Sequence, residues 1–321
     1  MRPITAEVKA VIDVGTNSIK FLAAEKTGAG GIRVLKDANN VARLGRGLRE
    51  TGRLAPDALE RAAAMVEEYA EAARGLDASE IALVGTMALR VAENTPAFAQ
   101  RVSELARLDL RVISGEEEAR LSYIAATLGM DDRSLVTFDV GGGSTELVFG
   151  RGETILRKFS LDLGALWLTE RFFIDDPVAL GSVEAADALI KKGLTEGGVS
   201  GGRGSSLVGM GGAVTTLASV KRGMTEYDSA AIQNSTLTMG DVAAQIADYA
   251  EKTLEERGRV AGLHPRRVDV ILAGACVVRA IMDTLGVQEL TVSVWGLRHG
   301  LMYEMMRTEK CQSRFITSST F

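Results

Sequence analysis

The chain has 321 residues, 46% of them hydrophobic and 25% charged, with a formal net charge of −5 at pH 7. This composition is ordinary for a soluble globular protein, and the length suggests two domains. The acidic net charge argues against a nucleic-acid partner. No apolar run reaches the about 18 residues that a membrane span needs, so we expect a cytoplasmic protein with no membrane partner.

Histidine and cysteine are scarce, which restricts the chemistry. His264 and His299 are the only histidines, so a Ser-His-Asp set or a paired-histidine metal site is not expected. Cys276 and Cys311 form no CxxC pattern, which argues against structural zinc and fits a reducing compartment. Any general base is therefore expected to be a carboxylate.

The first part of the chain predicts strands with a tight turn between the first two, followed by helices and further strands. We predict strands at 8–14, 19–25, 31–44, 81–86 and 110–114, and helices from Pro56, at 95–107 and at 115–129. The last helix has three acidic residues in its first turn, where the helix dipole favours them.

The second part begins with the same order of strand, glycine turn and strand. We predict strands within 134–150, 153–165, 206–212 and 289–294, a flexible loop at 197–206, and helices at 166–174, 182–194, 213–222, 240–257, 268–285 and 296–307. Residues 309–321 are expected to form a loose tail.

The repeated order predicts duplication at the scale of a domain. The two copies begin at AVIDVGTNS and VTFDVGGGS, in which Asp13 and Asp139 hold equivalent places. We expect domain I at 1–122 and domain II at 123–308, with the helix at 296–307 packing back on domain I.

Glycine-rich turns after apolar strands predict phosphate binding. Such turns direct several backbone N–H groups towards one point, and glycine lets a phosphate approach the backbone closely. A third turn joins a strand to a helix N-terminus, which also favours anions. Ordinary structural turns are the alternative in each case. The predicted phosphate-binding residues are Gly15, Thr16, Asn17, Ser18, Gly141, Gly142, Gly143, Ser144, Gly211, Gly212 and Ala213.

Carboxylates beside these turns predict a magnesium site. Asp13 and Asp139 each end a strand at a glycine turn, where carboxylate oxygens suit a hard cation. Strand alternation places Glu146 where it can join Asp139. A solvated strand glutamate is the alternative for Glu146.

Two further motifs carry charged residues. SGEEEAR (114–120) holds three consecutive glutamates, one of which is a candidate general base, with stabilisation of the helix dipole as the alternative. GTMALR (85–90) places Arg90 after a strand end, where it can hold phosphate in a bidentate manner, with a surface arginine as the alternative.

These motifs together resemble a known family. VIDVGTNSIKF, RLGRGL, GTMALR, ISGEEEARL, FDVGGGSTELV, GMGGAVTTLA and GLRHGLMYE occur in the order found in the exopolyphosphatase/guanosine pentaphosphate phosphohydrolase family, over residues 8–306. The resemblance implies an α/β fold of two actin-like, ribonuclease-H-like domains with the active site in an interdomain cleft. It implies that Glu118 is the catalytic base, that Asp139 and Glu146 position metal and water, and that Arg90 binds phosphate.

The sequence departs from the family pattern at a few places. Arg46 stands where many members carry a carboxylate or an amide, and Trp167 stands where arginine is frequent. SVWGLRHG lacks the acidic residues often seen beside Gly296 and at the position of His299. These departures are expected to affect domain contacts or selectivity and to leave the catalytic residues unchanged.

We therefore expect an exopolyphosphatase that uses Mg²⁺ to release orthophosphate from polyphosphate. Guanosine pentaphosphate is the alternative substrate, and a small-molecule kinase or a non-catalytic nucleotide-binding protein of the same superfold are the rival functions. A basic cluster favours polyphosphate, unless it is only a solvated turn: Arg43, Arg46, Arg49 and Arg53. The oligomeric state stays open, with a homodimer as one option.

Overall fold

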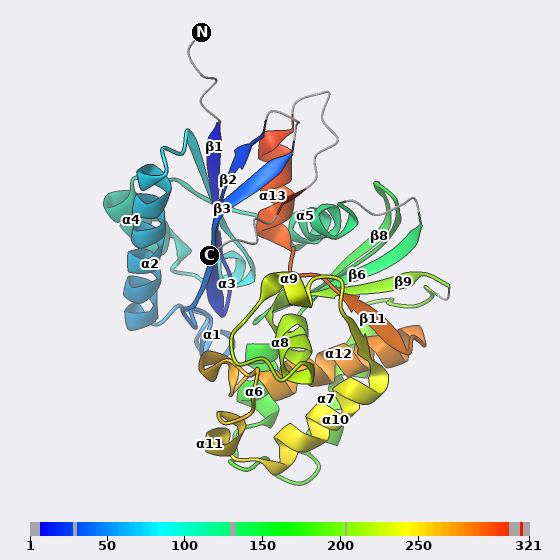
Figure 1. The fold of residues 1–321 in the computed structure, drawn as a ribbon. Helices are drawn as coiled ribbons and strands as arrows, with labels where there is room; N and C mark the ends of the chain where they lie inside the picture. The colour runs from blue at the N-terminus through cyan, green and yellow to red at the C-terminus, as the bar shows by residue number, and fades with distance from the viewer. Residues whose placement is uncertain (1–6, 28–30, 129–132, 203, 308–314, 317–321) are drawn as a thin grey trace. The chain divides into compact units, whose positions relative to one another are not determined.

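A computed structural model of the chain describes residues 7–27, 31–128, 133–202, 204–307 and 315–316. The chain divides into two compact units (Figure 1). Unit 1 contains Met1–Gly129 and Leu297–Phe321, and unit 2 contains Met130–Gly296. The division falls a short way after the predicted 122/123 boundary, and the helix predicted at 296–307 belongs to unit 1.

Within the described residues, unit 1 is built on a six-stranded sheet of order β12-β3-β2-β1-β4-β5. Its strands are β1 (Val8–Val14), β2 (Ser18–Lys26), β3 (Ile32–Val41), β4 (Glu80–Gly85), β5 (Leu110–Val112) and β12 (Phe315–Ile316). Its helices are α1 (Leu48–Thr51), α2 (Pro56–Gly75), α3 (Met87–Val91), α4 (Thr95–Ala106), α5 (Gly115–Thr127) and α13 (Leu297–Met306).

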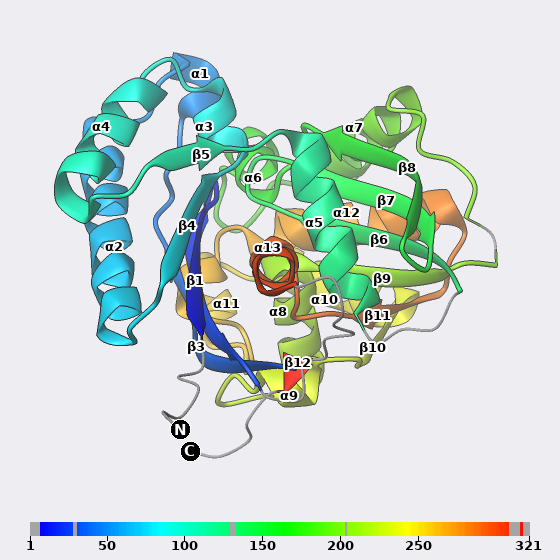
Figure 2. The same cartoon turned by 90° about the horizontal axis from the view of Figure 1, so that it is seen from above.

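Helices cover both faces of this sheet. Figure 2 shows α2 and α4 on one face and α13 with α5 on the other. Ile12 and Phe21 belong to the core under α2, where Phe21 stacks on Tyr69 with ring centroids 5.1 Å apart. Since side chains alternate along a strand, Asp13 points to the opposite face, the one that α13 covers.

Unit 2 is also built on a six-stranded sheet within the described residues, of order β10-β11-β9-β6-β7-β8. Its strands are β6 (Ser134–Val140), β7 (Thr145–Arg151), β8 (Thr154–Leu161), β9 (Ser206–Met210), β10 (Thr236–Thr238) and β11 (Glu289–Val292). Its helices are α6 (Ala165–Phe172), α7 (Ser182–Glu196), α8 (Gly211–Lys221), α9 (Ser229–Ile232), α10 (Met239–Glu251), α11 (Leu254–Arg257) and α12 (Ile271–Leu285), with a 3₁₀ turn at Pro265–Arg267.

The two sheets share one topology, as the repeated motif predicts. In each, three antiparallel strands (β1–β3 or β6–β8) are followed by parallel strands, β4 and β5 or β9 and β11. The duplicated hairpins therefore occupy the same place in both units, with β12 and β10 as additional edge strands.

The apolar run at 268–285 forms a central helix of unit 2. Most of α12 is buried, and it packs against α6, α7, α8 and α10. A helix covered on several sides is apolar around most of its circumference, and its charged side chains are limited to Arg279 and Asp283, which pair with Asp187 and Lys191 of α7. The helix prediction for this run is confirmed from Ile271 onward.

The long helix predicted at 240–257 is confirmed as far as Glu251, but its continuation is wrong, because the helix ends at Lys252. Lys252 has an extended backbone (φ −96°, ψ 143°), and α11 starts a new helix behind Thr253. Thr253 and Glu256 form a capping box, in which each side chain accepts a backbone N–H of the other residue. The amphipathic period continues through this break, so periodicity alone does not reveal it.

The predicted tail at 309–321 lies outside the described residues except for Phe315 and Ile316. This pair forms β12, which pairs in parallel with β3 at Ile32 and Arg33. The tail prediction missed this short edge strand, since two residues give no pattern.

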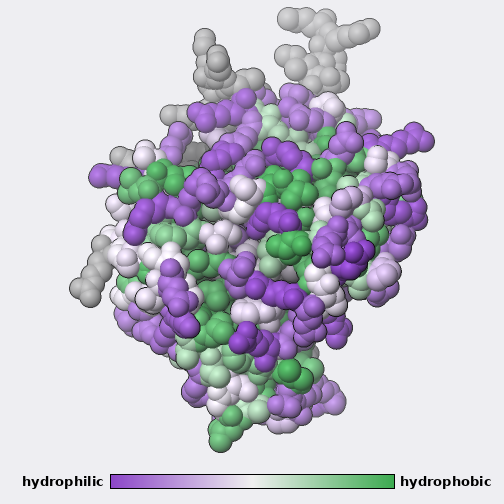
Figure 3. All heavy atoms as spheres, turned by 180° about the vertical axis from the view of Figure 1, so that it is seen from behind, coloured by the Kyte–Doolittle hydropathy of each residue, from purple (hydrophilic) through white to green (hydrophobic). Residues whose placement is uncertain are grey.

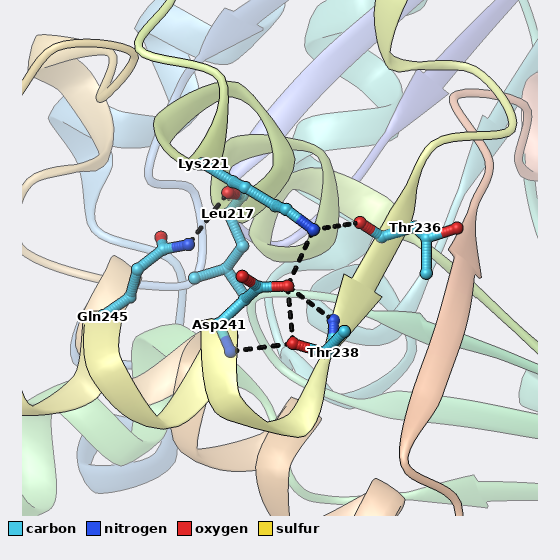
Figure 4. Close-up of polar contacts among 6 residues, drawn as sticks. All are labelled: Leu217, Lys221, Thr236, Thr238, Asp241 and Gln245. Atoms are coloured by element: carbon cyan, nitrogen blue, oxygen red, sulfur yellow. Dashed lines mark hydrogen bonds and ion pairs between the residues drawn. The ribbon is translucent and has the colours of Figure 1, made fainter.

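Helix α10 holds the C-terminal end of α8 (Figure 4). Lys221 of α8 donates to the Asp241 carboxylate at 2.8 Å and to the Thr236 carbonyl at 2.9 Å. Gln245 donates to the Leu217 carbonyl at 3.0 Å, and Thr238 caps α10 by a capping box with Asp241. These contacts fix the axis of α8, whose first turn carries the third glycine motif.

The surface is mixed in character. On the face drawn in Figure 3, hydrophilic side chains surround scattered hydrophobic ones. Among the helices that the structure describes, none has both the length and the hydropathy to span a bilayer.

Candidate active site

The first glycine turn joins β1 to β2 and is tied to the chain that follows β3. The N–H of Gly15 donates to the Ser18 carbonyl at 3.0 Å. The Asn17 carbonyl accepts from Ala42 and Arg43, and the Thr16 carbonyl accepts from Gly45. In a trans peptide the C=O and the next N–H point in opposite directions. The N–H groups of Asn17 and Ser18 therefore face away from residues 42–45.

The second turn repeats this geometry in unit 2. Gly141 donates to the Ser144 carbonyl at 2.9 Å, and the carbonyls of Gly141 and Gly142 each accept a 2.9 Å bond from the first turn of α6. Gly164, which caps α6, allows this contact, because a methyl group there would overlap the backbone of Gly143. The N–H groups of Gly142 and Gly143 therefore face away from α6.

The third turn lies at the N-terminus of α8. Gly211 has φ +87°, a conformation that side-chain-bearing residues rarely adopt. A methyl group at Gly212 would overlap the guanidinium of Arg267, so this side chain lies directly over the turn. The helix N-terminus and the arginine both favour an anion at this place.

Arg267 was not among the residues predicted from the sequence. It is half-buried, and within the described residues no hydrogen bond or ion pair of its guanidinium is found. Burial lowers the pKa of this guanidinium, which means that its charge is under-solvated and that a bound phosphate would stabilise it. HPRRVD carries no motif that separates this arginine from Arg266, which is exposed.

Two of the predicted metal ligands lie together in unit 2. Asp139 and Glu146 are directly opposite on β6 and β7, which places their Cβ atoms about 4.5–5.5 Å apart. Glu146 is buried and accepts a 2.9 Å hydrogen bond from Ser160. The Asp139 carboxylate contacts the Gly211 backbone closely, since a methyl group there would overlap Oδ1.

The equivalent pair in unit 1 has a different charge. Asp13 pairs across the strands with Lys20, whose Nζ lies 3.1 Å from Oδ2. The position that holds Glu146 in unit 2 is thus a lysine in unit 1. Asp13 is 1% exposed, and its Oδ1 has no hydrogen-bond partner among the described residues. Its carboxylate is therefore partly neutralised by the protein itself and leaves one buried oxygen for water or another donor.

Arg90 and Glu118 form an ion pair in unit 1. Nη1 of Arg90 donates to Glu118 Oε2 at 2.8 Å and to the Ile113 carbonyl at 3.0 Å. Arg90 lies in α3 rather than directly at the end of β4. In the described part of the chain, its Nε and Nη2 make no hydrogen bond to protein, so both can donate to a phosphate.

The three consecutive glutamates have different surroundings. Glu116 is exposed, and Glu117 lies 3.3 Å from the exposed Arg111. The side chain of Glu118 is only 14% exposed and is held by Arg90. Ser114 caps the helix by accepting from the N–H of Glu117 at 3.1 Å. Glu118 is thus the glutamate of this helix that has a fixed and sheltered carboxylate.

The three residues that depart from the family pattern lie in different parts of the structure. Arg46 is exposed on the segment tied to the first turn, and Trp167 lies in the first turn of α6 with the Arg171 guanidinium 5.5 Å from its ring centroid. His299 is buried near Asp37, which Arg298 binds with two hydrogen bonds. Burial and the charge of Arg298 lower the pKa of His299 to about 4, so the ring is neutral at pH 7.

Comparison with known proteins agrees with this geometry. The model of the Ppx/GppA phosphatase family matches residues 23–309. Exopolyphosphatase 2 of Mycobacterium tuberculosis is 36% identical over 91% of this chain and 96% of its own length. The crystal structure of the Aquifex aeolicus Ppx/GppA family member has a TM-score of 0.79 at 30% identity, covering 93% of this chain and 97% of that one.

A crystal structure of an exopolyphosphatase from Cytophaga hutchinsonii supports the same fold, with a TM-score of 0.85 at 23% identity over 94% of this chain and 98% of that one. The predicted α/β fold with two actin-like domains is confirmed. The chain therefore belongs to the Ppx/GppA phosphatase family, whose members are phosphoanhydride hydrolases.

Proposed function

We propose that this protein is an exopolyphosphatase that releases the terminal orthophosphate of inorganic polyphosphate. The observation that carries the proposal is the duplicated turn, whose carbonyls are held by a neighbouring segment so that its N–H groups face away from that segment. Two such turns, together with the glycine turn at the N-terminus of α8, suit a substrate made of linked phosphates. The name of the M. tuberculosis relative supports the same substrate.

In this proposal, Glu118 accepts a proton from the attacking water. The water oxygen forms a bond to the terminal phosphorus, the bridging P–O bond breaks, and the shortened chain leaves with the bridging oxygen. Arg90 fixes the position of the Glu118 carboxylate through its hydrogen bond and offers Nε and Nη2 to the phosphate. Arg267 and the turn at Gly212 hold a further phosphate. Positioning and electrostatics account for most of the rate enhancement.

The carboxylates of unit 2 fit Mg²⁺ best. Asp139 and Glu146 are adjacent, whereas Lys20 partly neutralises Asp13. Among the described residues, no group of three or more His, Cys, Asp or Glu side chains is arranged to hold a metal. Mg²⁺ commonly takes one or two carboxylates and completes its shell with phosphate oxygens and water. When bound, it would neutralise charge that develops on the phosphate oxygens.

Polyphosphate is favoured over guanosine pentaphosphate by the basic segment that follows β3. Arg43 donates its backbone N–H to the first turn, and Arg46 and Arg49 are exposed on the same segment. Arg53 lies 3.1 Å from Glu93, an exposed pair that salt weakens. Distributed arginines attract a phosphate chain without recognising any base.

The test is phosphate release from long polyphosphate and from guanosine pentaphosphate at matched concentrations. We expect faster turnover of polyphosphate, with an affinity that falls as salt rises. Neutralising Arg46 and Arg49 together should raise KM for long polyphosphate more than for tripolyphosphate. The matched control is the double neutralisation of Arg61 and Arg101, which pair with Asp57 and Glu60 at exposed positions. Equal effects on both chain lengths, or faster turnover of guanosine pentaphosphate, would favour the guanosine substrate.

A further inference from the structure

Helix α13 lies against α5, the helix that carries Glu118. The two elements are far apart in sequence, and Figure 2 shows them on the same face of the unit 1 sheet. The contact is a close approach of backbones. A methyl group on Gly300 would overlap the carbonyl oxygen of Leu121. Only a residue without a side chain fits here while both helices keep their places.

Besides the hydrogen bonds of Arg298 to Asp37 of β3, polar contacts in the second half of α13 hold the helix in this position. Glu304 binds the Arg120 guanidinium with both carboxylate oxygens, one of them 3.1 Å from Nη2. Lys9 of β1 donates to the Met305 carbonyl at 2.9 Å. The helix is thus fixed to α5 along one side and to the sheet at its C-terminal end.

A glycine inside a helix has a cost that calls for an explanation. It destabilises a helix interior by about 0.8–1.0 kcal/mol relative to alanine. Gly300 lies inside α13, which spans Leu297–Met306, and has no positive φ that would require glycine. The close approach to Leu121 is the structural reason for its presence.

We propose that Gly300 is a positioning residue for Glu118, an inference that rests on the proposed function of Glu118. Leu121 lies three residues after Glu118 on α5, so both residues share one face and one turn of the helix. A larger residue at position 300 displaces the Leu121 backbone and carries Glu118 away from Arg90. A displacement of about 1 Å at a reacting group is enough to reduce turnover by about 100-fold.

Gly300→Ala tests this inference, with Gly75→Ala as the matched control. Gly75 also lies in a helix of unit 1, but a methyl group there meets no atom within 4 Å. Both substitutions favour the helix, and only the one at position 300 displaces a neighbour. We expect kcat of Gly300→Ala to fall by about 100-fold with KM within about twofold, and Gly75→Ala to behave as wild type.

A double-mutant cycle with Glu118→Gln separates positioning from a general loss of structure. If Gly300 acts through Glu118, Gly300→Ala should lower kcat much less in the Glu118→Gln background. A folded Gly300→Ala enzyme with the kcat of Gly75→Ala, or an equal loss in both backgrounds, would overturn the inference.

If Gly300→Ala does not fold, Glu304→Gln provides the second variant. It removes the half-exposed ion pair with Arg120 and leaves the contact of Gly300 with Leu121. We expect kcat to fall several-fold, and to fall less in the Glu118→Gln background. An unchanged kcat would count against the inference. Wild-type turnover is measured first. If polyphosphate is not hydrolysed, the proposed substrate is wrong, and the cycle is run on guanosine pentaphosphate, where the same outcomes decide.

Discussion

Replacing Gly212 with alanine puts a methyl group where the Arg267 guanidinium lies. The guanidinium is the end of a flexible side chain, so it can move away without displacing the backbone. Since Gly212 lies in α8, alanine also suits its backbone. We therefore expect Gly212→Ala to fold with undiminished stability, but with the Arg267 side chain displaced from the third turn.

The size of the effect follows from the contact that is lost. A hydrogen bond to a charged group contributes about 1.5–3 kcal/mol, which corresponds to a loss of about 10- to 150-fold in kcat/KM. Arg267→Ala should lower kcat/KM by at least the same factor. In the Arg267→Ala background, Gly212→Ala should cost little, because the contact that it disrupts is already absent.

The assay is steady-state phosphate release from polyphosphate by the two single variants and the double variant. Gly240→Ala is the control, because Gly240, like Gly212, is the second residue of a helix in unit 2, and a methyl group there meets only Thr238 Oγ1 at 3.7 Å. Additive losses from Gly212→Ala and Arg267→Ala, or an unchanged kcat/KM in Gly212→Ala, would refute the assignment of Arg267 to phosphate binding.

Other residues give equally direct tests. Glu118→Gln should lower kcat by about 10²–10⁴-fold with substrate binding retained, and a larger loss in Glu117→Gln would show that the base is the other glutamate. Asp139→Asn should raise the Mg²⁺ concentration needed for half-maximal activity. Full activity of the wild-type protein in excess chelator would exclude Asp139 as a Mg²⁺ ligand. The pKa of His299 is lowered to about 4 in the fold, against about 6.5 in the unfolded chain, so protonating the ring destabilises the folded state. The free energy of unfolding should therefore be highest above pH 6.5 and should fall by about 3 kcal/mol as pH falls to about 4. In denaturant unfolding, the free energy of unfolding should fall less between pH 7 and pH 4 in His299→Gln than in wild type. An equal fall in both proteins would contradict this role of His299.

The sequence by itself determined the local features of this protein. Apolar strands that end in an aspartate and a glycine turn are local patterns, so both hairpins, at Asp13 and Asp139, were predicted at their places. The apolar run at 268–285 was also assigned correctly, because its length suits a helix better than a strand. The break at Lys252 was missed, because the capping box at Thr253 lies inside a continuous amphipathic pattern.

Tertiary structure decided which of these residues meet. The chemistry of GEEEAR does not distinguish Glu118 from Glu117, and only the family resemblance pointed to Glu118. The structure supplies the physical difference, because Arg90 lies beside Glu118 and Arg111 beside Glu117. In the same way, HPRRVD gives no sign that Arg267 lies over Gly212.

The same holds for the charge at the two hairpins and for α13. The sequence pattern makes Asp13 and Asp139 equivalent, and only the strand pairing shows that one faces Lys20 and the other Glu146. Gly300 acquires its meaning from the Leu121 backbone, far away in the chain. Periodicity and turn propensity report on neighbours in sequence, whereas ion pairs and close backbone contacts depend on segments that only folding brings together.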